Sequence, residues 1–234
     1  MTKSKTKSKQ GTGLIVSLGY GTNAKTTPKA KREPGSIPNP EALLDIVRAL
    51  GAVLVDCRAF PGPLDRADTM VNPKTGRLVF KSGKIVYVRT GLWAMDLAEA
   101  LGRQYEYHGD TLGGLHGDAG GPTEAGMAML VRRYEAGERL ILMCSEATPG
   151  ECHRHFAMSV PGRWPDGSAL PTARPKSLAE RGVTVRHLIV ADGDADPLTL
   201  DTAWIFEATA YESFLRGKRK DYPAEPLVDF IANL

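Results

Sequence analysis

This 234-residue sequence has few cysteines and no long run of apolar residues. Three cysteines, a small and odd number, exclude a disulfide-built secreted scaffold and suit a reducing compartment. No stretch approaches the roughly 18 apolar residues of a membrane span, and the N-terminus is polar and lysine-rich where a signal peptide needs an apolar core. We therefore expect a cytoplasmic protein that does not bind membranes.

Acidic residues are absent from the first 32 positions, which hold eight lysines and arginines. The formal net charge of +3 therefore divides into this basic end and a remainder in which 22 basic residues face 27 acidic ones. Residues 1–12 have no apolar periodicity, which predicts a disordered tail. Two interpretations of its charge stay open: a solubilising terminus, or a salt-sensitive attraction to a polyanion such as nucleic acid.

Several motifs of known chemistry are also absent. Residues 13–21 contain neither the G-x-G-x-x-G of dinucleotide-binding folds nor the G-K-[ST] end of a P-loop. The loop of a cysteine phosphatase or rhodanese closes on an arginine six positions after the cysteine, but those positions are Gly150 and Met158. The His-x-Glu and Pro-Cys-x-x-Cys pattern of zinc deaminases does not occur. We accordingly expect no cofactor.

Short apolar runs alternate with segments of helical periodicity along most of the chain. The expected helices cover residues 40–50, 93–101 and 123–136, and a fourth begins near Cys152. The expected strands cover residues 14–18, 52–55, 105–107, 140–143 and 183–190. Nearly continuous apolar strands separated by helices indicate a parallel sheet covered on both faces. We predict an α/β fold in three layers, with a mostly parallel open sheet of the Rossmann-like type.

Three segments depart from this alternation, and residues 13–190 otherwise form one predicted domain. Within residues 64–90, two strand-like runs, 78–80 and 85–88, flank Lys81–Lys84 and predict an inserted hairpin. Residues 161–176 contain four prolines and are typical of a linker. Residues 191–234 are predicted to be a C-terminal extension of two helices, the first carrying Trp204, Phe206 and Phe214 and the second carrying Leu227, Phe230 and Ile231.

Polar residues follow each of the predicted parallel strands. In an open parallel sheet, ligands bind beyond the carboxyl ends of the strands, so these residues are candidates for a shared site. They are Gly19 and Tyr20 after the first strand, Asp56 and Arg58 after the second, His108, Gly113 and Gly114 after the third, and Cys144 after the fourth.

The densest group of candidates lies in residues 144–155. Cys144 ends a predicted strand, and Cys152 begins the next predicted helix, where free amides and the helix dipole favour anions and lower a cysteine pKa. We predict that Cys152 is a reactive thiolate, that Glu146 or His153 acts as acid or base, and that Arg154 clamps a phosphate or carboxylate.

Other interpretations of the same residues stay open. Zinc accepts ligands of the types found at Cys144, Cys152, His153 and His155, but adjacent ligands at 152 and 153 point in different directions on a helix, so no metal ligand is assigned. Asp56 and Arg58 fit a strand-end ion pair as well as a catalytic pair. Cys57, at a strand end, and His187, within a strand, are expected to be structural residues.

The order of these motifs resembles the bacterial domain of unknown function 488 family over about residues 13–190. The resemblance lies in Gly19-Tyr20 after a strand, Asp56-x-Arg58 with Pro61 nearby, Leu112-Gly113-Gly114 after an aromatic strand, and Cys144-x-Glu146 followed by Cys152-His153-Arg154. This chain departs from the family pattern at Gly21, Cys57 and Pro63. The resemblance implies a compact α/β fold with a shared site, and it names no reaction.

These observations predict an enzyme, of hydrolase or transferase type, that acts on a phosphate-bearing, nucleotide-like or nucleic-acid substrate at the carboxyl edge of the sheet. The alternatives are a non-catalytic nucleic-acid or protein binding module with a buried polar network, and a zinc-stabilised domain. The predicted catalytic residues are Asp56, Glu146, Cys152 and His153, and the predicted substrate-binding residues are Tyr20, Arg58, Gly113, Gly114, Cys144 and Arg154.

Overall fold

A computed structural model of the full chain describes eleven segments of it. They are residues 13–19, 40–59, 61–74, 78–82, 93–113, 121–146, 149–161, 174–190, 203–218, 220 and 223–234. None of the helices within these segments has the length and apolar character that crossing a membrane requires.

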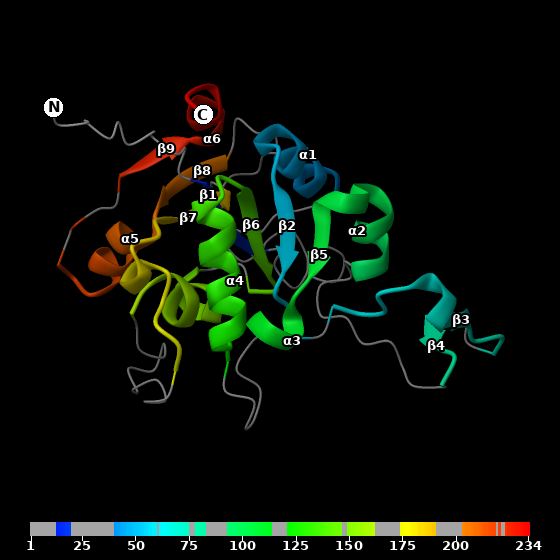
Figure 1. Ribbon diagram of the computed structural model, residues 1–234. Coiled ribbons are helices and arrows are strands. Elements are labelled where there is room, and N and C mark those ends of the chain that lie inside the picture. Colours follow the sequence, from blue (N-terminus) through cyan, green and yellow to red (C-terminus); the bar gives the residue numbers. More distant parts are fainter. Residues whose placement is uncertain are drawn as a thin grey trace, which may run out of the picture.

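Strands and helices alternate along the chain (Figure 1). The α-helices are α1 (Pro40–Leu50), α2 (Ala94–Leu101), α3 (Gly109–Leu112), α4 (Glu124–Glu135), α5 (Ala208–Leu215) and α6 (Leu227–Ala232). The strands are β1 (Leu14–Gly19), β2 (Val53–Asp56), β3 (Thr69–Val71), β4 (Leu78–Phe80), β5 (Tyr105–Tyr107), β6 (Arg139–Cys144), β7 (Val185–Val190), β8 (Ala203–Glu207) and β9 (Ala224–Pro226).

The main sheet has seven strands in the order β5-β2-β6-β1-β7-β8-β9. The first five are parallel to their neighbours, and β8 and β9 are antiparallel. In the register, Gly19 is opposite Cys144, and Asp56 is opposite both Met143 and Tyr107. The five parallel strands therefore end at one edge of the sheet, as the α/β prediction requires. The protein is an α/β protein with a mostly parallel sheet.

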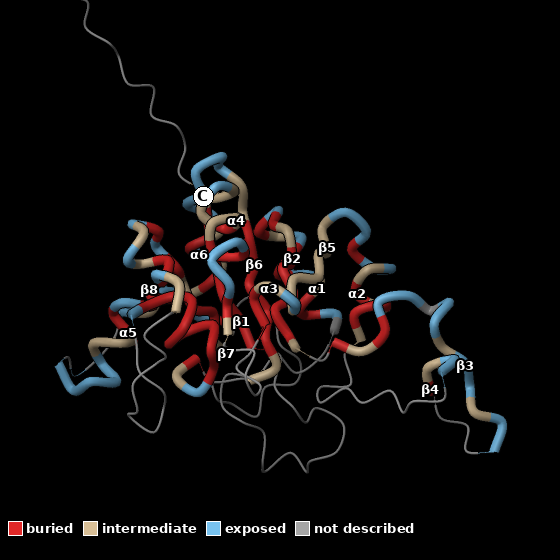
Figure 2. Tube along the Cα trace, turned by 60° about the horizontal axis from the view of Figure 1, so that its bottom comes forward, coloured by how far each residue is buried: buried red, intermediate tan, exposed pale blue. Residues whose placement is uncertain are grey.

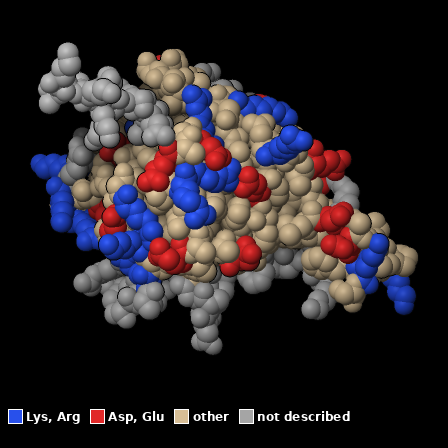
Figure 3. All heavy atoms as spheres, viewed as in Figure 1, with Lys and Arg blue, Asp and Glu red and all other residues tan. Residues whose placement is uncertain are grey.

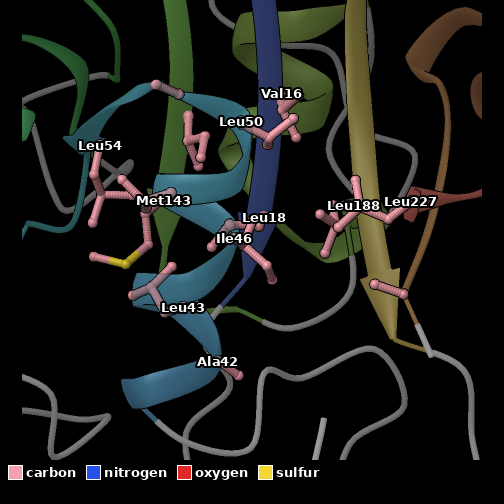
Figure 4. Close-up of a cluster of buried hydrophobic side chains, with 14 of the residues drawn as sticks. Val16, Leu18, Ala42, Leu43, Ile46, Leu50, Leu54, Met143, Leu188 and Leu227 are labelled. Carbon is pink, nitrogen blue, oxygen red and sulfur yellow. The ribbon is translucent and has the colours of Figure 1, made fainter. Parts of the chain in front are cut away.

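Helix α1 covers one face of this sheet (Figure 4). Pro40 starts the helix, where its missing N–H is not needed, and Gly51 ends it with a φ of 57° that a residue with a Cβ rarely adopts. The apolar side chains Leu43, Ile46 and Leu50 recur at helical spacing and pack against the sheet. Helices α2 and α6 contribute to the same core.

The opposite face is covered by α4, with the segment 154–160 and residues 178–185 beside it. Alternation along β1 explains why one strand serves both cores: Ile15 faces this side, whereas Val16 and Leu18 face α1. Thr123 caps α4, because its Oγ1 accepts a hydrogen bond of 3.1 Å from the Gly126 N–H. Helices thus cover both faces of the sheet.

The prediction that the C-terminal segment is only helical was wrong. Trp204 and Phe206 lie in strand β8, which pairs with β7, and only Phe214 lies in the following helix α5. The physical reason is that Ala203 and Ile205 complete the core under α6, whereas Phe206 packs against His187 on the other face. Ala203 and Ile205 therefore face one core and Phe206 the other, an alternation that a strand provides and a helix does not.

The inserted segment holds a small antiparallel ribbon away from the main sheet (Figure 2). Leu78–Phe80 pairs with Thr69–Val71, across the predicted turn that begins at Asn72. Residues 83–90 lie outside the described segments, so the predicted pairing around Lys81–Lys84 stays a prediction. Of the predicted linker 161–176, residues 162–173 are likewise not described.

We expect the packing of α1 on the sheet to dominate stability. Ile46 is fully buried, so Ile46→Ala should lower the free energy of unfolding by about 2–5 kcal/mol, through lost burial and the cavity left behind. Arg48→Ala on the exposed side of the same helix should change it by less than about 1 kcal/mol. Urea denaturation measures both, and equal effects would contradict the proposed orientation of α1.

Candidate functional site

Four side chains converge where β6 ends: those of Cys144, Glu146, Cys152 and His153. Cys144 is the last residue of β6, and its Sγ donates a hydrogen bond of 2.8 Å to Glu146 Oε2. Cys152 Sγ lies 3.3 Å from the same oxygen. His153 Nδ1 lies 3.6 Å from Cys144 Sγ and 3.7 Å from Cys152 Sγ. We call these four residues the thiol cluster.

The chain reaches this arrangement through irregular backbone rather than through the regular helix predicted from Cys152. A 3₁₀ turn covers Pro149–Glu151, and a π-helix follows at Arg154–Ser159. The Cys152 N–H donates to the Pro149 carbonyl, so this amide belongs to the turn. Residues 152 and 153 lie between the 3₁₀ turn and the π-helix. Their side chains therefore approach each other, whereas on a regular helix we expected them to point in different directions.

A carbonyl group fixes the orientation of the His153 ring. His153 Nε2 lies 3.0 Å from the Leu112 carbonyl oxygen, which can only accept, so Nε2 carries a proton. Leu112 ends helix α3, which packs on α4. Nδ1 is therefore the ring nitrogen that faces both sulfur atoms.

Burial and neighbouring charges separate the acidities of the two thiols. Burial raises the pKa of Cys152, but its hydrogen bond with Cys144 and the charges of Arg154 and His153 outweigh it, so this pKa lies well below its usual value. A hydrogen bond with Cys152, together with burial, raises the pKa of Cys144 well above its usual value. Burial lowers the pKa of His153, but the charge of Cys152 outweighs it and the pKa is raised.

Arg154 follows the cluster in the sequence and contacts the backbone of one of its members. Its side chain is fully buried, and its Nη1 donates a hydrogen bond of 2.5 Å to the Glu146 carbonyl. A buried guanidinium here keeps a fixed positive charge next to the two sulfur atoms, because an arginine is not deprotonated in a protein. Arg154 also ties the loop after β6 to the π-helix.

Asp56 and Arg58 form a buried ion pair at the end of β2. Arg58 Nη2 lies 2.6 Å from Asp56 Oδ2, and Arg58 Nε lies 2.9 Å from Asp56 Oδ1. Tyr105 on the neighbouring strand donates its hydroxyl to Asp56 Oδ2 at 2.9 Å, and burial raises the Tyr105 pKa. These contacts fit the structural interpretation, and a catalytic role of Asp56 stays a prediction.

The structure describes only some of the other predicted binding residues. A Cβ on Gly113 would clash with the carbonyl oxygen of Gly109, one turn earlier in α3, so the end of this helix requires a glycine. Tyr20 and Gly114 lie outside the described residues. Their predicted contacts with a substrate stay predictions.

A second polar array lies on the same face of the sheet, and sequence reasoning did not find it. Ser17 Oγ lies 2.5 Å from His187 Nδ1, His187 Nε2 lies 2.8 Å from His155 Nδ1, and His155 Nε2 lies 2.9 Å from Glu212 Oε2. Arg216 donates to the other oxygen of Glu212. Ser17, His155 and His187 are fully buried, whereas Glu212 reaches the surface.

The hydrogen bonds of this array all run in one direction when each ring carries one proton. The Glu212 carboxylate, whose pKa is lowered by its hydrogen bond from His155, accepts from His155 Nε2. His155 Nδ1 then accepts from His187, and His187 Nδ1 accepts from Ser17. Because both nitrogens of His155 have these partners, His155 is not part of the thiol cluster, although its sequence spacing suggested that it was.

Among the residues that the structure describes, those of the thiol cluster are placed so that they could hold a metal ion. Its four ligand atoms all lie within 4.8 Å of one another, and Glu146 is the member that is not buried. Chemically, the cluster offers two thiols, an imidazole nitrogen and a carboxylate around one point. Such a set can exchange protons within itself, or lose protons together and bind a cation.

Comparison with known proteins adds no relative. No protein-family model matches this chain, and neither the curated proteins nor the solved structures contain a significant match to it. The function of this protein is therefore inferred from the geometry of the thiol cluster and its surroundings.

We expect Asp56→Asn to destabilise the fold strongly. It removes one charge of a buried pair and leaves Arg58 uncompensated, which typically costs about 3–5 kcal/mol. Asp45→Asn, in a solvent-exposed ion pair with Arg48, should cost less than about 1 kcal/mol. Urea denaturation would measure both, and an unchanged unfolding free energy for Asp56→Asn would instead leave a catalytic role as its better explanation.

The buried His187 predicts how stability depends on pH. Burial, together with the neighbouring His155 and Arg154, holds its pKa well below the value of about 6.5 that it has when unfolded. The folded state then stays neutral at His187 while the unfolded state takes up a proton. The contribution of His187 to the free energy of unfolding is complete above about pH 6.5. It falls as the pH drops below that value, by up to about 1.4 kcal/mol per pH unit.

Urea denaturation between pH 5 and pH 8 would measure this slope. His187→Asn should reduce the slope, although it lowers stability at neutral pH by removing two hydrogen bonds. His108→Gln, at a partly exposed histidine, is the matched control and should leave the slope in place. An unchanged slope in His187→Asn would show that another group produces the acid sensitivity.

Proposed function

We propose that this protein is an enzyme of hydrolase or transferase type that acts on a phosphate-bearing substrate, of the nucleotide or nucleic-acid class. The observation that carries this proposal is the convergence of the thiol cluster on one point beside the buried guanidinium of Arg154. Acids and bases with shifted pKa values, gathered at one place, are typical of catalytic sites.

The position of the cluster supports the proposal. Cys144 ends a central parallel strand, and the carboxyl edge of such a sheet is where ligands bind in open α/β folds. A Rossmann-like arrangement of this sheet, and membership of the domain of unknown function 488 family, are parts of the same proposal. Both depend on the order of Asp56-x-Arg58, Cys144-x-Glu146 and Cys152-His153-Arg154 along the chain.

Charge supports an anionic substrate. Arg154 contacts the cluster through the Glu146 carbonyl, whereas Arg58 gives both Nε and Nη2 to Asp56. We therefore assign the anion to Arg154, with Arg58 as a positioning residue. The described surface is not uniformly basic, since Lys, Arg, Asp and Glu are interspersed over the face in Figure 3. Attraction of a polyanion is accordingly assigned to the basic residues 1–32.

Glu146 is the acid–base group of this proposal. It is the partly exposed member of the cluster, so water or a substrate hydroxyl can reach its carboxylate. Its Oε2 accepts a hydrogen bond from Cys144 Sγ at 2.8 Å and lies 3.3 Å from Cys152 Sγ, which fixes the direction of the carboxylate. A carboxylate that is positioned but accessible can take a proton from an attacking oxygen.

One observation favours a second candidate, a non-catalytic nucleic-acid or protein binding module. Asp56, Arg58 and Tyr105 satisfy one another inside the protein, which is what a structural polar network does. In this alternative the basic N-terminal residues bind the partner. Removing residues 1–32 would not test it, because that segment contains the central strand β1.

The test combines turnover and binding in the full-length protein. Hydrolysis of bis(4-nitrophenyl) phosphate and of labelled single-stranded and duplex oligonucleotides measures turnover. Glu146→Gln should reduce turnover by about 10²-fold or more, because the proton acceptor is lost. Arg154→Lys should lower kcat/KM, since an ammonium cannot replace a planar guanidinium. Glu151→Gln, an exposed carboxylate in the adjoining turn, is the matched control and should behave as wild type.

A variant with Lys3, Lys5, Lys7 and Lys9 changed to Gln separates the two candidates. In an enzyme, this variant should weaken oligonucleotide binding at low salt but keep turnover of the small diester. If the wild type turns over none of these probes and the variant no longer binds oligonucleotides, the binding module is the correct function.

A further inference from the structure

We propose that the thiol cluster is a zinc site, in which Cys144, Cys152 and His153 hold the ion and Glu146 occupies the fourth, exchangeable position. The inference deepens the proposed function in that it names the cofactor of the same site. The metal site itself does not require that the protein be an enzyme, so the two proposals can fail separately.

The distances within the cluster match a tetrahedral centre. With zinc bonds of about 2.0–2.3 Å, neighbouring ligand atoms of a tetrahedron lie about 3.3–3.8 Å apart. Three of the separations between ligand atoms are 3.3, 3.6 and 3.7 Å. The fourth, 2.8 Å between Cys144 Sγ and Glu146 Oε2, is a thiol–carboxylate hydrogen bond that loses its proton when zinc binds.

The His153 ring is oriented as in a zinc ligand. Its Nε2 proton points to the Leu112 carbonyl at 3.0 Å, which leaves the Nδ1 lone pair directed at the space between the two sulfur atoms. Histidine ligands of zinc usually donate their second ring N–H to a carbonyl or carboxylate in this way. A histidine with a merely structural role has no need to direct its lone pair at two thiols.

The charges also balance. Two thiolates and a carboxylate carry three negative charges, which cannot lie together in a buried site without cations. Zn²⁺ and the adjacent guanidinium of Arg154 together neutralise them. The same donors exclude Mg²⁺ and Ca²⁺, which prefer oxygen ligands, and favour a metal that binds thiolate and imidazole.

Glu146 distinguishes this site from a closed structural one. A structural zinc site has four buried protein ligands, whereas a catalytic site has three and keeps one position for water or substrate. Cys144, Cys152 and His153 are buried, and only Glu146 is partly exposed. When water or substrate replaces Glu146 in that position, bound zinc would polarise the incoming oxygen, and the displaced Glu146 carboxylate would be the neighbouring proton acceptor.

The first test is the metal content of full-length protein purified without chelator, measured by mass spectrometry. We expect about one equivalent of zinc per chain in the wild type, and less than about a tenth in Cys144→Ser, Cys152→Ser and His153→Asn, because each removes a ligand. Cys57→Ser is the matched control, since Cys57 is equally buried but donates its thiol to the Val55 carbonyl. It should retain the zinc.

Cobalt provides a readout that does not depend on how well the cysteine variants fold. After a chelator removes zinc from the wild type, added Co²⁺ should give the visible bands of a tetrahedral ion and a thiolate-to-cobalt charge-transfer band. Glu146→Gln should retain both metals, with changed visible bands, because the three other ligands remain. Loss of metal in Glu146→Gln would show a closed structural site and overturn the exchangeable position.

The proposal is overturned if the wild type contains less than about a tenth of an equivalent of any transition metal and added Co²⁺ gives no charge-transfer band. Turnover of a phosphate probe by such metal-free protein would leave the proposed function standing without zinc. Stoichiometric zinc in a protein that turns over no probe would support the metal site and remove the enzyme.

Discussion

Parallel pairing of β6 with β1 and β2 is the constraint on which the site depends. Parallel strands end at the same edge, so Gly19, Asp56 and Cys144 are brought together although they lie far apart in the sequence. The two cores, one under α1 and one under α4, fix the faces of these strands through the alternation of side chains. A slip of one residue would turn Cys144 to the other face of the sheet and disperse the thiol cluster.

Around this edge, most of the polar groups are buried, and each burial has to be compensated. Asp56 forms an ion pair with Arg58, and the Leu112 carbonyl accepts a hydrogen bond from His153. Glu212 accepts a hydrogen bond from His155, the histidine that pairs with His187. These contacts divide the polar residues into two kinds: those held in separate pairs or series, and the thiol cluster, whose four ligand atoms converge on one space. This division, more than the residue types, distinguishes a scaffold from a reactive centre.

Local patterns were sufficient to predict much of this arrangement. The apolar runs around Val16, Leu54 and Ile141 indicated buried parallel strands, and the motifs at their ends indicated Cys144, Glu146, Cys152 and His153. Three features could not be predicted locally. The π-helix after His153 has no sequence signature, Ser17 meets His187 across 170 positions, and the strand at 203–207 forms because β7 offers it a partner.

The position of β1 also has a kinetic consequence. It lies in the middle of the sheet, yet Leu14 pairs with Arg139 and Ile15 with Val185, so both of its neighbours come much later in the chain. Its six residues are all buried in the folded protein. During synthesis this apolar segment is therefore made before the strands with which it pairs. Such long-range pairing is slow to form. The segment that anchors the whole sheet is thus also the one most exposed to aggregation before folding is complete.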